Sequence, residues 1–146
     1  MSLRTLRSTA CLLLACLGLP LASAQSSPPD GYGLTKEQAI EVCKPAGERA
    51  YLARLVCPDD SHPAFARIGS VGLRHEFPAG MSEDERMKIV MAALENAALE
   101  PGSTDHHMID GYSVECGKTR ITLYLDMYHC DRPPPDIAPA GFTILR

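Results

Sequence analysis

The sequence lacks the short motifs that mark common catalytic sites. It contains no G-x-S-x-G elbow and no H-E-x-x-H pair. The glycine-rich stretch 69–72 lacks the Lys-Ser/Thr ending of a phosphate-binding loop, so we interpret it as a bend or bulge in a strand. Neither Ser70 nor Ser113 has a base that the sequence places near it. These absences favour a non-enzymatic protein without a cofactor over an enzyme.

Basic residues are scarce. Beyond residue 24 the chain carries 12 lysines and arginines against 18 aspartates and glutamates, a formal charge of −6. A mildly acidic surface argues against nucleic acid and anionic membranes as partners, because both are negatively charged. It fits a cationic protein partner, and the plain alternative is a solvated acidic surface.

Long hydrophobic runs are confined to the first residues. Arg4 and Arg7 precede an apolar run over 10–21, which ends in a small-x-small cleavage site. This pattern predicts a signal peptide over 1–24 and a periplasmic or secreted protein. The run is too short to span a membrane, which takes about 20 apolar residues. An uncleaved anchor and lipid attachment at Cys16 are the alternatives.

Four cysteines follow residue 24, and no C-x-x-C pair occurs among them. An even count in an exported chain predicts two disulfide bonds. A four-thiolate metal site is the alternative. The four residues are Cys43, Cys57, Cys116 and Cys130.

The first half of the chain predicts a helix followed by a hairpin. A capping box begins a short helix over 35–43, which Pro45 ends. Residues 49–57 suit a helix face or an alternating strand equally well. The turn cluster at 58–61 favours a hairpin between them and residues 64–77.

A second helix is predicted over 82–99. Ser82 and Glu85 form a capping box, and Pro101 follows the end. Its apolar residues recur at helical spacing, so we expect them to face the core; a soft methionine-rich groove is the alternative. These residues are Met87, Val90, Met91, Leu94 and Ala98.

Residues 107–130 predict the clearest hairpin. With Gly117-Lys118 as a two-residue turn, facing residues have numbers that sum to 235. Glu115 then faces Arg120, and one face of the hairpin is apolar except for Asp110. Cys116 and Cys130 lie about 35 Å apart on this ladder, too far to bond each other. Each should therefore reach Cys43 or Cys57.

These elements predict an α+β fold in helix-hairpin-helix-hairpin order, with helices on one face of an antiparallel sheet. We place a flexible leader at 25–34, the domain at 35–132, and a proline-rich extended tail at 133–146. Residues 141–145 could add an edge strand to the sheet.

Two surfaces are candidates for function. The outer face of the last hairpin carries two tyrosines with polar neighbours, which predicts a binding surface unless the tail covers it. The open end of the same hairpin carries histidines and a carboxylate, which offers an alternative zinc or copper site. The surface comprises His107, Tyr124, Asp126 and Tyr128, and the metal alternative comprises Asp105, His106 and His129.

Taken together, the residues favour a small exported binding module, such as an inhibitor or accessory protein of the bacterial envelope with a cationic partner. An inhibitor of a cell-wall hydrolase is one concrete version, by analogy alone. The alternative is a metal-binding protein or metal-dependent enzyme built on the histidine and aspartate cluster. A purely structural envelope protein is a third interpretation.

Overall fold

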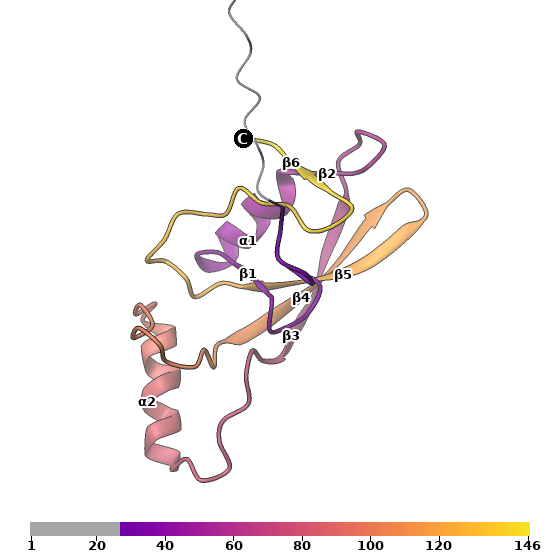
Figure 1. Cartoon of the computed structure of the whole chain (residues 1–146). Coiled ribbons are helices and arrows are strands. Elements are labelled where there is room, and N and C mark those ends of the chain that lie inside the picture. Colours follow the sequence, from indigo (N-terminus) through magenta and orange to yellow (C-terminus); the bar gives the residue numbers. More distant parts are fainter. Residues whose placement is uncertain (1–26) are drawn as a thin grey trace, which may run out of the picture.

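The structure is a computed structural model, and it describes residues 27–146. The predicted signal peptide and the first residues of the leader lie outside this range. Within it, two helices and six strands make an α+β fold (Figure 1). No helix of the described part is long and apolar enough to cross a membrane. In chain order the elements are β1 Ile40–Glu41, α1 Lys44–Ala53, β2 Leu55–Val56, β3 Ala64–Leu73, α2 Glu83–Leu94, β4 Met108–Cys116, β5 Thr119–Asp126 and β6 Thr143–Ile144.

The main sheet is mixed. Its strand order is β1-β5-β4-β3, with β1 parallel to β5 and the other neighbours antiparallel. The β4–β5 hairpin has the predicted register, and Glu115 pairs with Arg120 at 2.6 Å. Its apolar face is buried, because alternate side chains of a strand point to the same side and meet α1 there. The core contains Tyr51 and Leu52 of α1 with Tyr112, Val114, Leu123 and Leu125 of the hairpin.

The helix predicted over 35–43 is wrong. Ile40–Glu41 is instead a strand, and the Val42 N–H donates to the carbonyl of Asp126 at 2.8 Å. This pairing buries Ile40 and Val42 completely, a gain that outweighs a local capping preference. Pro45 lies in the first turn of α1 and so begins a helix rather than ending one, because a proline there lacks only an N–H that has no helical partner.

The first predicted hairpin is also wrong, and with it the helix-hairpin-helix-hairpin order. Residues 49–53 belong to α1, and β2 pairs with β6 of the tail. The long strand β3 pairs with β4, with bulges beside Gly69 and Gly72. The turn predicted at 58–61 is present, but a turn alone does not determine which strands the flanking segments pair with.

Helix α2 begins at the predicted capping box, in which Ser82 and Glu85 exchange hydrogen bonds. Its apolar stripe does not face the core, and no residue of the helix is buried. Figure 1 shows α2 standing apart from the sheet on two long connections. The expected core-facing stripe is therefore wrong. The exposed fractions are 56% for Met87, 40% for Val90, 48% for Met91 and 60% for Leu94.

Two disulfide bonds staple the fold. Cys43 bonds Cys130, and Cys57 bonds Cys116, with Cα atoms 4.5 and 5.7 Å apart. The prediction that Cys116 and Cys130 do not bond each other is confirmed, because the hairpin keeps them at opposite ends of β5. Each bridge joins the hairpin to the segment that contains α1.

Candidate metal centre

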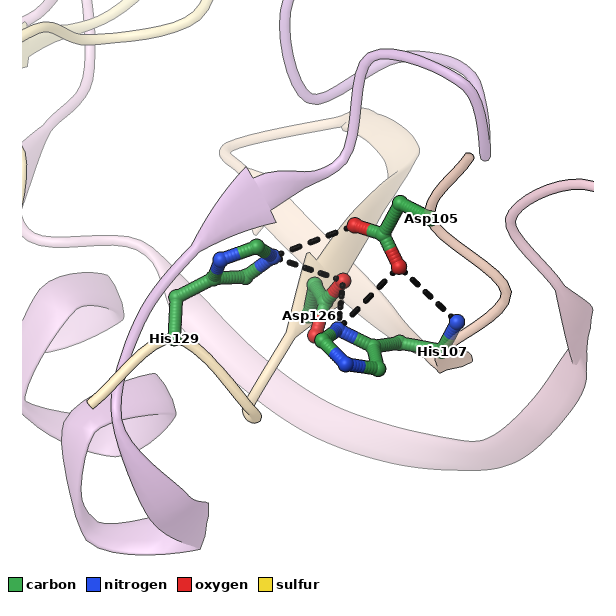
Figure 2. A group of neighbouring side chains, drawn as sticks. All are labelled: Asp105, His107, Asp126 and His129. Carbon is green, nitrogen blue, oxygen red and sulfur yellow. Dashed lines mark hydrogen bonds and ion pairs between the residues drawn. The ribbon is translucent and has the colours of Figure 1, made fainter. Parts of the chain in front are cut away.

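Four buried side chains converge at the open end of the β4–β5 hairpin (Figure 2). His107 immediately precedes β4, and Asp105 lies in the connection two residues earlier. Asp126 is the last residue of β5, and His129 follows three residues later. Their exposed fractions are 8% or less. Burial of so many titratable groups in one place requires that they satisfy one another.

Asp126 and His129 lie on the same side of the chain, although a continuous strand would direct them to opposite faces. The strand ends at Asp126, and its Oδ1 accepts the N–H of Tyr128 at 3.1 Å, which turns the backbone. The His129 N–H then donates to the carbonyl of Val42, and the Cys43–Cys130 bridge holds the segment there. His129 is thereby directed back to Asp126.

The contacts within the cluster are nearly equal. His129 Nε2 lies 3.2 Å from Asp105 Oδ2 and 3.1 Å from Asp126 Oδ2. His107 Nδ1 lies 3.1 Å from Asp105 Oδ1 and 3.3 Å from Asp126 Oδ2. These contacts use both oxygens of Asp105; with one ligand atom taken from each residue, the four atoms lie within 4.8 Å of one another. A tetrahedral zinc ion with bonds of about 2.0–2.1 Å has ligand atoms about 3.3–3.4 Å apart, so the four short contacts are close to that spacing and the wider pairs would have to draw together to reach it.

The carboxylates are held in place by backbone N–H groups. Asp105 Oδ1 accepts the N–H of His107 at 2.9 Å, as Asp126 does that of Tyr128. Such outer contacts orient the ligands of metal sites. They belong to the same short segments that supply the histidines, so the geometry does not depend on long flexible side chains.

The electrostatics of the cluster favour ionised carboxylates. Burial raises the pKa of Asp126, but hydrogen bonds from His107 and His129 outweigh it and hold the pKa well below the usual range. Burial also opposes ionisation of Asp105, and the contacts with His129 and the His107 N–H lower its pKa on balance. Burial lowers the pKa of His129, yet both carboxylates together raise it to about 9. His129 is therefore protonated at neutral pH.

Arg74, which immediately follows β3, borders the cluster. Its Nη1 donates to Glu41 at 2.8 Å and lies 3.3 Å from Asp105, while Nη2 lies 3.4 Å from Asp126. The two aspartate contacts exceed the roughly 2.7–2.9 Å of charge-assisted hydrogen bonds. The shorter bond with Glu41 holds Arg74 at the edge, where its charge makes a small contribution to lowering the pKa of Asp105.

Of the three residues of the alternative metal site, Asp105 and His129 lie together at 3.2 Å, and His106 does not join them. The Nδ1 of His106 instead donates to the carbonyl of His75 at 2.7 Å. His107 and Asp126 take part, although both were expected on an outer surface. They are 3% and 0% exposed, and the segment that follows β5 contacts both, Tyr128 against His107 and His129 against Asp126.

The other two residues of the expected surface are half-buried tyrosines. The N–H of Tyr124 donates to the carbonyl of Gly33, so the N-terminal segment runs beside it. Tyr128 lies against His107, with ring centroids 5.0 Å apart. The four residues therefore do not form one exposed face. Whether either tyrosine binds a partner stays a prediction.

No sequence pattern linked Arg74 or Glu41 to the cluster, because both lie more than 30 residues before it along the chain. The histidines and aspartates could be found from their gathering at one hairpin end. Comparisons with family models, with curated proteins and with solved structures give no match.

Proposed function

We propose that this chain is an exported protein that binds one divalent transition-metal ion, with Zn²⁺ as the best fit. The ligands are Asp105, His107, Asp126 and His129. The observation that carries the proposal is the convergence of four buried ligand atoms, one from each residue, which all lie within 4.8 Å of one another. Mixed imidazole and carboxylate ligands suit zinc, and two carboxylates neutralise its charge.

The site has the character of a closed centre. Four protein ligands would fill the four positions of a tetrahedral ion, and all four side chains are buried, which would leave no position for a substrate. We therefore assign the metal to stabilising or sequestering roles rather than to hydrolysis. Binding would replace the proton of His129 with the metal ion, since a ligating imidazole must be neutral.

The alternative to a metal site is an ion-pair network without metal, centred on protonated His129 and Arg74. To distinguish these two alternatives, metal content is measured on protein purified without a tag, and the protein is then titrated with Zn²⁺ and Co²⁺. We expect about one ion per chain and a visible Co²⁺ spectrum of tetrahedral type. Asp105→Asn and His129→Gln should each weaken binding at least about a hundredfold, because each removes a direct ligand.

His75→Gln is the matched control, because its exposed ring lies outside the cluster and its backbone is unchanged. It should bind metal like the wild type. Equal zinc affinity in the wild type and His129→Gln would contradict the proposal. So would a wild type that takes up no metal at micromolar concentration.

Binding of a cationic protein is a second candidate function, and the uncovered apolar face of α2 favours it. Monomeric proteins rarely leave such contiguous faces uncovered. The first turn of the helix adds Glu83, Asp84 and Glu85. Met91→Lys should then weaken capture of a cationic secreted hydrolase, whereas an unchanged affinity would exclude this face.

A further inference from the structure

The outer face of α2 is an apolar stripe that the described part of the chain leaves largely exposed. The opposite side of the helix faces inward, where Ile89 and Ala93 line a cavity of about 530 Å³ between α2 and the rest of the chain. Arg86 lies over the ring of Phe77, 5.8 Å from its centroid, and so turns one edge of the helix toward the same body. Figure 1 shows α2 at the margin of the molecule, where a second chain can reach its outer face. The stripe consists of Met87, Val90, Met91 and Leu94, which are 40–60% exposed.

Two opposite charges border this stripe on its other edge. Lys88 and Glu95 are seven residues apart, nearly two helical turns, so both lie on the side of the helix next to Met91. Both side chains are exposed. Among residues 27–146 neither forms an ion pair. The stripe therefore offers a partner one positive and one negative charge along a single edge.

We propose that α2 pairs with α2 of a second copy of this chain, antiparallel about a two-fold axis near residue 92. Such an axis brings each edge of a helix against the same edge of its partner. Lys88 of each copy then faces Glu95 of the other, so both charges find partners. At the centre of the pair Met91 packs opposite Leu94. The pairing is independent of the proposed metal cluster.

The charges also select the direction of the pair. In a parallel pair, the edge with Lys88 and Glu95 would face the opposite edge of the partner, which carries Val90 near the height of Glu95 and no basic residue there. A cationic protein is the competing occupant of this face. It would bring its positive charges against Lys88 as well as Glu95, whereas a second copy matches both.

The contact is small, so the association should be reversible. Helix α2 has 12 residues and is about 18 Å long at the helical rise. One such helix from each copy gives an interface below the roughly 1,200 Å² that stable complexes bury. We therefore expect monomers at low concentration and dimers from micromolar concentration upward.

Charge reversal tests the pairing, with sedimentation velocity of the purified protein from micromolar to submillimolar concentration as the measurement. Lys88→Glu and Glu95→Lys should each weaken self-association at least about tenfold, because each sets like charges against one another at both contacts. The double variant Lys88→Glu/Glu95→Lys restores opposite charges and should dimerise like the wild type. A mixture of the two single variants should form mixed dimers, since one carries only acidic and the other only basic residues at these positions.

Glu76→Lys is the control, because it makes the same charge change as Glu95→Lys at an exposed residue outside α2. It should dimerise like the wild type. A wild type that stays monomeric at submillimolar concentration would overturn the proposal, and capture of a cationic protein by that monomer would assign the face to the competing occupant. A mixture of the single variants that associates no better than either alone would overturn the antiparallel pairing.

Discussion

At the scale of single residues, the buried carboxylates of the fold lie in environments with different chemistry. In the cluster of Asp105 and Asp126, histidines and an arginine surround the carboxylates, which stay ionised. Glu48 in α1 is equally buried but has one partner, the Tyr112 hydroxyl that donates to it at 2.9 Å. Its other oxygen has no partner among the described residues.

Glu48 should make the protein less stable as pH rises. Burial raises its pKa from 4.5 to about 7, which the Tyr112 hydrogen bond only partly offsets. The folded state thus holds a proton that the unfolded state has released, and stability falls between pH 4.5 and 7. Glu48→Gln removes this dependence. Relative to the wild type, the free energy of unfolding of Glu48→Gln should increase by about 2 kcal/mol between pH 5 and pH 8.

Urea denaturation of both proteins at the two pH values checks this prediction. Glu95→Gln on the exposed surface is the control and should change little. A difference between Glu48→Gln and wild type that stays constant with pH would contradict a protonated Glu48.

At the scale of elements, α2 has the periodicity of a core helix without its burial. Capping and spacing are local properties, and the sequence predicted both correctly. Which face meets the core depends on where the flanking connections lead. Here residues 74–82 and 95–107 carry the helix away from the sheet. The parallel strand β1 shows the converse, because local capping favoured a helix and tertiary pairing with β5 prevailed.

Leu94→Ala in α2 should therefore cost little stability. Leu94 is 60% exposed, and surface substitutions usually change the free energy of unfolding by less than about 0.5 kcal/mol. Leu125→Ala is the matched change in β5, where the side chain is completely buried. It should cost about 2–5 kcal/mol. Denaturant titration of both variants gives the comparison, and a similar loss in each would mean that α2 packs against the core.

At the scale of the whole molecule, the two disulfides join distant parts of the chain at opposite ends of the hairpin. They span 87 and 59 residues, so each should stabilise the fold by about 4 kcal/mol in the chain-entropy account. Only the Cys43–Cys130 bond lies beside the proposed metal cluster, because His129 immediately precedes Cys130. Cys116 lies at the far end of β4, about 30 Å away at the strand rise.

The paired changes Cys43→Ala/Cys130→Ala and Cys57→Ala/Cys116→Ala should separate these roles. Both should lower the free energy of unfolding, and the two losses should differ by less than about 1 kcal/mol, since loop length enters only logarithmically. The first pair alone should weaken zinc binding, because it releases the segment that positions His129. Calorimetric zinc titration beside denaturation tests this, and equal zinc affinity in both variants would contradict it.

Local patterns along the chain were sufficient for the β4–β5 register, the capping box of α2 and the exclusion of a Cys116–Cys130 bond. Each depends on residues close in sequence or on the fixed rise of a strand. The partners of β1, β2 and β3, the exposure of α2 and the position of Arg74 depend on long-range packing. No pattern of neighbouring residues in the sequence predicts this packing. The proposed metal cluster depends on both local pattern and long-range packing. Its histidines and aspartates lie near one hairpin end in the sequence, but the backbone turn after Asp126 determines which four side chains converge.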